Sequence, residues 1–245
     1  MWRWSKLRTE YSNYYYHLEE KNVLDLIYFV SVVTGACPRL VTQYAQEIEN
    51  DLVLRNAMST FRDSNHELRD SELAIGRRLG WYLFTRVNKP KVVVETGIHH
   101  GLGGLVLIRA LEMNSREGNH GTYIGTDINP NSGYLIKDKL GTNHKILIGD
   151  SIQSLRNLVT PIDLFINDSD HSSDYEYQEY ETIFSLLTET AQILGDNSHV
   201  SDSLRKFSEE KNRKYLFFKE VPKNHWYPGA GIGVSFKSPT NPVNS

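Results

Sequence analysis

The chain has little of several features that would place a protein in a special class. Its 245 residues include a single cysteine, Cys37, which excludes an intramolecular disulfide and a cysteine-rich zinc site. The most apolar segment, Leu26 to Cys37, is shorter than the roughly 20 residues of a membrane-spanning helix. The formal net charge is -3 and the basic residues are scattered, so the sequence shows no concentration of positive charge that would attract the phosphates of a nucleic acid. We therefore expect a soluble, cytoplasmic protein whose partner is neither a nucleic acid nor a membrane.

What the chain does have, from residue 90 onward, is a regular alternation of short β-branched runs and helical patterns. Strands are predicted at 91–96, 122–127, 144–150, 162–168, 191–196, 215–221 and 231–237, and helices at 102–114, 131–140, 151–159, 173–188 and 199–212. Such alternation predicts a parallel sheet with helices on both faces. Only a short connection separates the last two strands, so we expect an antiparallel hairpin at the sheet edge. The predicted fold is α/β, with a Rossmann-like seven-stranded sheet whose last strand is antiparallel.

The first third of the chain reads as helical, with candidates at 17–34, 39–57 and 66–88. The third pattern stops at Pro90, just before the first strand. We therefore divide the chain into a helical N-terminal region, 1–88, and an α/β domain, 89–245. The helical region is expected to cap the domain or to join two copies in a homo-oligomer.

A glycine-rich turn follows the first strand in the stretch ETGIHHGLGG. Glycines between a strand and a helix let backbone N–H groups approach a ligand closely, although a tight turn that only packs the helix has the same composition. The dinucleotide fingerprint G-x-G-x-x-G fails here, because its third glycine would fall on Val106 and an alternative start would need glycine at His99. A nicotinamide-dependent oxidoreductase is therefore disfavoured. The remaining pattern is a glycine loop preceded by Glu95.

The stretch ETGIHHGLG resembles the first motif of the class I S-adenosylmethionine-dependent methyltransferases. In that family an acidic residue and the loop hold the methionine part of the cofactor, an acid after the second strand binds the ribose, and residues after the third strand contact the adenine. The stretches YIGTDINP and ILIGDS supply the second and third motifs, at strand ends where parallel sheets bind ligands. The resemblance assigns to the cofactor Glu95, Gly97, Gly101, Gly103, Asp127, Ile128, Asp150, Ser151 and Asp168.

Two further acidic groups follow neighbouring strands. Asp168 comes after the fourth predicted strand, and Asp196 and Asn197 come after the fifth. Carboxylate and amide oxygens suit Mg²⁺, which keeps several of its waters. Helix capping explains the same residue types, and Asp170 competes with Asp168 as the ligand. The sequence thus predicts a magnesium site at Asp168, Asp196 and Asn197, with capping as the alternative.

The same pattern is similar to the metal-dependent O-methyltransferases of the catechol and caffeoyl-coenzyme A type, which hold their ion with an aspartate and an Asp-Asn pair. In those enzymes a lysine three residues after the first aspartate acts as the base, and this chain has His171 at that position. A D-x-x-H version resembles the antibiotic-pathway sugar O-methyltransferases, in which the histidine is the base, so the resemblance implies this role for His171, with a structural histidine as the alternative. The resemblance implies methyl transfer to a hydroxyl of a small natural-product, sugar or phenolic acceptor.

Aromatic and imidazole groups near the predicted cleft are candidates to contact the acceptor. They are His99 and His100 in the glycine loop, and His225, Trp226 and Tyr227 in the last hairpin connection. Aromatic walls suit a ring-shaped acceptor, although edge packing explains them equally well. The alternatives to Mg²⁺-assisted O-methylation are N-methylation, metal-independent O-methylation, and a regulatory module that binds the cofactor without transfer.

Overall fold

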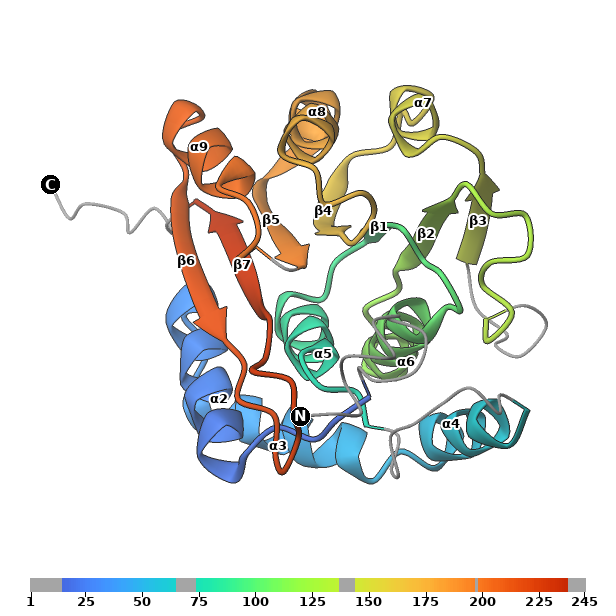
Figure 1. The fold of residues 1–245 in the computed structure, drawn as a ribbon. Helices are drawn as coiled ribbons and strands as arrows, with labels where there is room; N and C mark the ends of the chain where they lie inside the picture. The colour runs from blue at the N-terminus through green and yellow to red at the C-terminus, as the bar shows by residue number, and fades with distance from the viewer. Residues whose placement is uncertain (1–14, 65–73, 137–143, 197, 238–245) are drawn as a thin grey trace, which may run out of the picture.

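The computed structural model describes residues 15–64, 74–136, 144–196 and 198–237 (Figure 1). Its centre is a seven-stranded sheet in the order β3-β2-β1-β4-β5-β7-β6. The strands are β1 (Val92–Thr96), β2 (Thr122–Asp127), β3 (His144–Ile148), β4 (Ile162–Asn167), β5 (Leu187–Asp196), β6 (Lys214–Lys219) and β7 (Gly231–Phe236). Strands β1 to β5 run parallel, and β7 is antiparallel to both β5 and β6. The predicted Rossmann-like sheet with an antiparallel last strand is confirmed.

The last two strands form a hairpin in which the later strand lies inside the sheet and the earlier strand lies at its edge. β7 lies between β5 and β6, so that β6 is the edge strand of the sheet. The register pairs Asp196 with Ile232 and Phe218 with Ile232 from the other side. As a result, the connection 220–230 emerges at the same sheet edge as the end of β5.

Helices cover both faces of the sheet (Figure 1). On one face lie α7 (Ser151–Arg156), α8 (Ser173–Ile183) and α9 (Ser203–Glu210), and on the other lie α5 (Arg78–Asn88) and α6 (Leu102–Arg116). Side chains alternate along a strand, so Val92 and Val94 enter the core under α7 to α9, whereas Val93 enters the core with α5 and α6. Both faces of β1 are therefore buried, as expected for a central parallel strand.

The N-terminal helices form a further layer against α5 and α6 (Figure 1). They are α2 (Glu20–Thr34), α3 (Pro38–Glu49) and α4 (Leu52–Ser64), and their buried side chains belong to the same apolar core as those of α5 and α6. The predicted single helix 39–57 is wrong, because Asp51 accepts a hydrogen bond of 2.8 Å from the Leu54 N–H and so caps a new helix. Within the described part of the chain, no helix has the length and apolar character needed to cross a bilayer.

Several other predicted boundaries shift. The described part of the predicted helix 131–140 forms turns at 131–136, and residues 137–143 lie outside the described residues. There the Gly133 and Leu135 N–H groups donate to the carbonyls of His99 and His100, at 2.7 and 3.1 Å, instead of building a helix. In the predicted helix 66–88 the helical part begins at Arg78, and residues 65–73 lie outside the described residues.

Candidate active site

The glycine loop passes between the ends of β2 and β4. Gly97 has φ +78°, and a Cβ there would collide with the backbone carbonyl of Asp168. Its N–H donates to the Thr126 carbonyl at 2.9 Å, which fixes the loop to β2. Gly101, with φ +93°, then starts α6. The sequence needs glycine at Gly97 because both the left-handed backbone and the close approach exclude a side chain.

Glu95 lies buried under this loop. It accepts a hydrogen bond from the Tyr123 hydroxyl, and its carboxyl group lies so close to Gly103 that a Cβ there would collide with it. Burial raises the pKa of Glu95 to about 7, against the opposing effect of the Tyr123 hydrogen bond. An ammonium group bound beside it would favour the ionised form. Its predicted contact with the methionine part of the cofactor stays a prediction.

Asp127 ties the end of β2 to the glycine loop. Its Oδ2 accepts the His99 N–H at 2.7 Å, and its Oδ1 accepts the Asn129 N–H at 2.8 Å. His99 itself has φ +48°, a conformation that L residues adopt uncommonly. The next residue, Ile128, exposes 78% of its surface. Asp127 thus contacts the glycine loop directly, and the predicted contacts of Asp127 and Ile128 with the cofactor stay predictions.

Asp150 and Ser151 both make hydrogen bonds to neighbouring groups of the protein. Asp150 caps α7 by accepting the Gln153 N–H at 2.8 Å, and it also accepts from the Tyr175 hydroxyl at 3.0 Å.

Ser151 donates to the buried carboxyl group of Glu179. Other donors to Glu179 are Thr96, Asn167 and Ser169. Burial raises the pKa of Glu179 to about 7. Sequence reasoning missed this residue, because its helix reads as tyrosine-rich packing.

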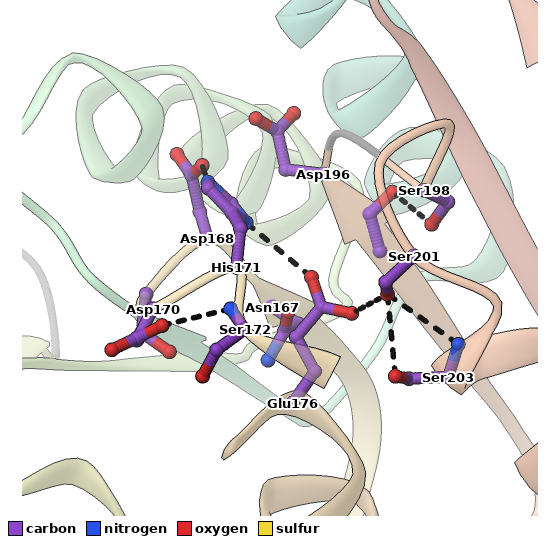
Figure 2. A network of polar contacts seen from close by, with 12 residues as sticks. Asn167, Asp168, Asp170, His171, Ser172, Glu176, Asp196, Ser198, Ser201 and Ser203 are labelled. Atoms are coloured by element: carbon purple, nitrogen blue, oxygen red, sulfur yellow. Dashed lines mark hydrogen bonds and ion pairs between the residues drawn. The ribbon is translucent and has the colours of Figure 1, made fainter. Parts of the chain in front are cut away.

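At the ends of β4 and β5, three polar groups converge (Figure 2). One ligand atom from each of Asp168, His171 and Asp196 lies within 4.8 Å of the other two. Asp170 is exposed and turned into its own loop, where Oδ1 accepts the Ser172 N–H at 2.8 Å. Of the two competing aspartates, Asp168 is therefore the one in the cluster.

The cluster contains a cation that the sequence did not reveal. The buried Arg77, just before α5, contacts both carboxylate oxygens of Asp196 through Nε and Nη2. Burial alone would raise the pKa of Asp196, but the Arg77 guanidinium and a hydrogen bond from Asp168 together outweigh burial and lower it. Burial, followed by the negative charge of Asp196, raises the pKa of Asp168 well above its ordinary value. Asp196 is thus held ionised, whereas the arginine charges near Asp168 offset its raised pKa only in part.

His171 connects this pair to a second row of polar groups (Figure 2). Its Nε2 lies 3.8 Å from Asp168 Oδ1, and its Nδ1 lies 3.4 Å from Glu176 Oε1. The other oxygen of Glu176 accepts from Ser201 Oγ, which in turn accepts the Ser203 N–H at 3.4 Å. Glu176 is buried on α8, one helical turn after the N-terminus. The imidazole is therefore held between two carboxyl groups.

Comparison with known proteins identifies the domain that carries this cluster. Residues 94–198 match the family model described as a methyltransferase domain. This part of the chain is therefore similar to methyltransferase domains. It contains the glycine loop, Asp127, Asp150, Asp168 and Asp196, whereas Arg77 and β7 lie outside the match.

Solved structures show the same fold. An O-methyltransferase from Bacillus cereus, in complex with S-adenosylhomocysteine, has a TM-score of 0.59 and 16% identity, covering 80% of this chain and 96% of that chain. An O-methyltransferase of tomaymycin synthesis from Streptomyces achromogenes, in complex with S-adenosylmethionine, has a TM-score of 0.57 and 15% identity, with 78% and 91% covered. A putative caffeoyl-CoA O-methyltransferase from Staphylococcus aureus has a TM-score of 0.55 and 13% identity, with 78% and 95% covered. No curated protein sequence matches this chain. The expected class I methyltransferase fold is confirmed.

The side chains of Asp168, His171 and Asp196 fit a divalent cation in part. Two carboxyl groups within reach of one another suit Mg²⁺, and burial together with the negative charge of Asp196 raises the pKa of Asp168. An imidazole is a less usual Mg²⁺ ligand than an oxygen. Arg77 already supplies one charge to Asp196. The third predicted ligand, Asn197, lies outside the described residues.

The predicted acceptor residues form two groups at the borders of the domain. His225, Trp226 and Tyr227 lie in the β6–β7 connection, where Tyr16 packs on His225 and Tyr227 with ring centroids 5.0 and 5.9 Å away. The Tyr16 hydroxyl donates at 3.0 Å to buried Glu220, which lies 3.9 Å from Arg77 Nη1.

The second group surrounds His100, whose pKa burial lowers to about 4. His100 packs on His99, on Phe61 from α4, and on Tyr134, with ring centroids 3.7, 5.2 and 5.3 Å away. A neutral imidazole in an aromatic wall is thus present beside the glycine loop. Contact of either group with an acceptor stays a prediction.

Proposed function

We propose that this chain transfers a methyl group from S-adenosylmethionine to a hydroxyl group of a small molecule, with His171 as the base. The observation that carries the proposal is the placement of His171 between Asp168 and Glu176, beside Asp196, in a methyltransferase domain. The complexes with S-adenosylmethionine and S-adenosylhomocysteine of the similar O-methyltransferases support the choice of donor.

The reaction needs alignment and removal of one proton. The sulfonium methyl is a strong electrophile, so the acceptor oxygen must lie in line with it. In this proposal Nδ1, 3.4 Å from Glu176 Oε1, carries the imidazole proton and donates it to that carboxyl group, so that the basic lone pair lies on Nε2. The hydroxyl proton passes to Nε2 as the oxygen–carbon bond forms and the sulfur–carbon bond breaks. Asp168 and Glu176 stabilise the resulting imidazolium, which then releases the proton to water.

Magnesium is the proposed further cofactor, held by Asp168 and Asp196 together with Asn197. When bound, it supplies positive charge that lowers the pKa of an acceptor hydroxyl. The Arg77 contact favours a second candidate, in which the guanidinium supplies the charge at Asp196 and transfer needs no metal. Exhaustive chelation distinguishes the two candidates. It stops methyl transfer that depends on Mg²⁺ and leaves methyl transfer unchanged if the Arg77 guanidinium supplies the charge.

The test begins with the donor, because the acceptor is not defined by the site. Calorimetric titration with S-adenosylhomocysteine, with and without Mg²⁺, tests cofactor binding directly. Formation of S-adenosylhomocysteine is then followed with a panel of catechols, phenols and sugars. His171→Ala should lower turnover by about 10²- to 10⁴-fold with unchanged affinity for S-adenosylhomocysteine. His120→Ala is the matched control, since this exposed histidine precedes the amino end of β2, whereas His171 lies at the carboxyl ends of the strands. Full turnover in His171→Ala would exclude the base role.

A further inference from the structure

Arg78, the first residue of α5, lies next to the glycine loop. Its guanidinium carbon lies 5.6 Å from the centroid of the buried Trp81 ring. The Trp81 ring and the carboxyl group of Glu95 both border Gly103, because a Cβ at that glycine would collide with each of them. Arg78, Trp81 and Glu95 are therefore neighbours at the foot of the loop, although α5 precedes the matched methyltransferase domain in the chain.

The Arg78 side chain has unused donor capacity. Its Nε is buried and makes no hydrogen bond within the described part of the chain, and the same holds for Trp81 Nε1, one helical turn further on. Among the described residues, no carboxylate lies within ion-pair distance of Arg78, in contrast to the neighbouring Arg77 with Asp196. A buried guanidinium donor without an acceptor is costly, so the arrangement calls for an anionic partner.

The charge of Arg78 acts on the cleft and opposes its own helix. Burial pushes the pKa of Glu95, Asp168 and Asp196 upward, and the Arg78 guanidinium acts against that shift at all three. A cation in the first turn of a helix is also disfavoured by the helix dipole. Arg78 thus contributes positive charge to a cleft rich in carboxyl groups at a position that does not favour the helix.

The ligand that fits is the amino-acid end of the methyl donor. S-adenosylmethionine carries an ammonium and a carboxylate on one carbon, and Glu95 is the group suited to the ammonium. A guanidinium binds a carboxylate through two parallel hydrogen bonds, which a lysine does not reproduce. We propose that Arg78 binds the α-carboxylate of the methyl donor and so positions its methionine arm between Arg78 and Glu95.

This inference rests on the proposed function and makes a claim of its own about Arg78. The same carboxylate is present in S-adenosylmethionine and in S-adenosylhomocysteine, so Arg78 contributes equally to substrate and product binding. Loss of such an interaction raises KM and the product Kd while leaving kcat nearly unchanged. Arg78 is therefore a positioning residue and not a group that takes part in bond making.

The experiment compares two ligands that differ in the amino-acid arm. Calorimetry measures S-adenosylhomocysteine and 5′-methylthioadenosine, which lacks both the carboxylate and the ammonium, on wild type, Arg78→Met and Arg78→Lys. Arg78→Met should weaken S-adenosylhomocysteine binding about 10- to 100-fold. Its affinity for 5′-methylthioadenosine should stay within about twofold of the wild-type value, because that ligand has no group for Arg78 to bind. Arg78→Lys should recover part of the loss. Arg116→Met, at the exposed end of α6, is the matched control and should change neither affinity.

The remaining outcomes separate the alternatives. Unchanged S-adenosylhomocysteine affinity in Arg78→Met overturns the proposal and leaves an acceptor carboxylate as the anion to consider. An equal loss for both ligands overturns it as well, because the pocket itself would then be damaged. Binding of 5′-methylthioadenosine by the variant shows in the same titration that the pocket is intact. If wild type binds neither ligand, the proposed function falls and the assignment of Arg78 falls with it.

Discussion

Replacing Arg77 by methionine should strongly destabilise the fold. The guanidinium is buried, contacts Asp196 through two nitrogens and lies 3.9 Å from Glu220 Oε2. Methionine fills similar apolar volume but leaves both buried carboxyl groups without their cation. Removing one partner of a buried ion pair costs about 3–5 kcal/mol of unfolding free energy. For a chain of this size, that loss corresponds to a fall in Tm of roughly 6–20 °C.

The loss of stability in Arg77→Met should depend on pH in a defined direction. In wild type the pKa of Asp196 is lowered, so its contribution to stability is present above the ordinary aspartate pKa and is lost as pH falls. Without Arg77, burial raises the pKa of the same carboxyl group, and its ionisation then destabilises the fold as pH rises. The deficit of Arg77→Met relative to wild type should therefore be larger at pH 8 than at pH 5. Urea denaturation at both pH values, with and without Mg²⁺, measures it.

The control is an arginine in a comparable but exposed ion pair. Arg205 on α9 pairs with Asp202 and Glu209, and its side chain is 42% exposed. Exposed pairs contribute about 0–1 kcal/mol, so Arg205→Met should change stability little at either pH. If Arg77→Met lost no more than Arg205→Met, and lost the same at both pH values, the assignment of Arg77 as the counter-charge of Asp196 would be refuted.

Three further predictions concern the cleft. Glu95→Gln should abolish a rise in S-adenosylhomocysteine affinity between pH 6 and 8, which in wild type should reach about tenfold because the Glu95 pKa of about 7 makes the carboxylate available only on the alkaline side. Calorimetry at the two pH values decides, and a rise that persists in the variant would contradict it. Gly97→Ala should cost more stability than Gly118→Ala and should also reduce cofactor binding, because both glycines have positive φ but only Gly97 faces the Asp168 carbonyl. Equal Tm losses in the two variants would argue against this contact. Glu176→Gln should lower turnover roughly tenfold, as expected for losing a hydrogen bond to a charged group, while leaving S-adenosylhomocysteine affinity unchanged. Steady-state kinetics beside calorimetry would show a wrong assignment as unchanged turnover.

The sequence predicted those parts of the structure that depend on local pattern. The glycine loop was predictable because Gly97 must adopt positive φ where the chain passes the Asp168 backbone, and the acids after β2, β3 and β4 follow from strand ends that share one edge. The hairpin of β6 and β7 was predictable from its short connection. Its insertion beside β5 was not, because that order depends on pairing across the whole sheet.

Residues that act through long-range contacts escaped prediction. Arg77 reaches Asp196 from 119 positions away, and in the sequence it is one of two arginines in a helical pattern. Glu176 and Glu179 lie on the helix that reads as tyrosine-rich packing, and only the fold shows that one faces His171 while the other joins the strand ends. Charged residues at buried positions within an amphipathic helix would have been the available signal.

The position of β7 between β5 and β6 also has a consequence for folding during synthesis. β6 pairs with β7 alone, and the Asp196 end of β5 pairs with β4 on one side and with β7 on the other. When β6 emerges from the ribosome, its partner strand β7 has not yet emerged. The edge of the sheet that carries Asp196 is therefore completed only after residues 231–236 emerge. The strand pairing beside Asp196 is thus among the last parts of the sheet that a nascent chain can form.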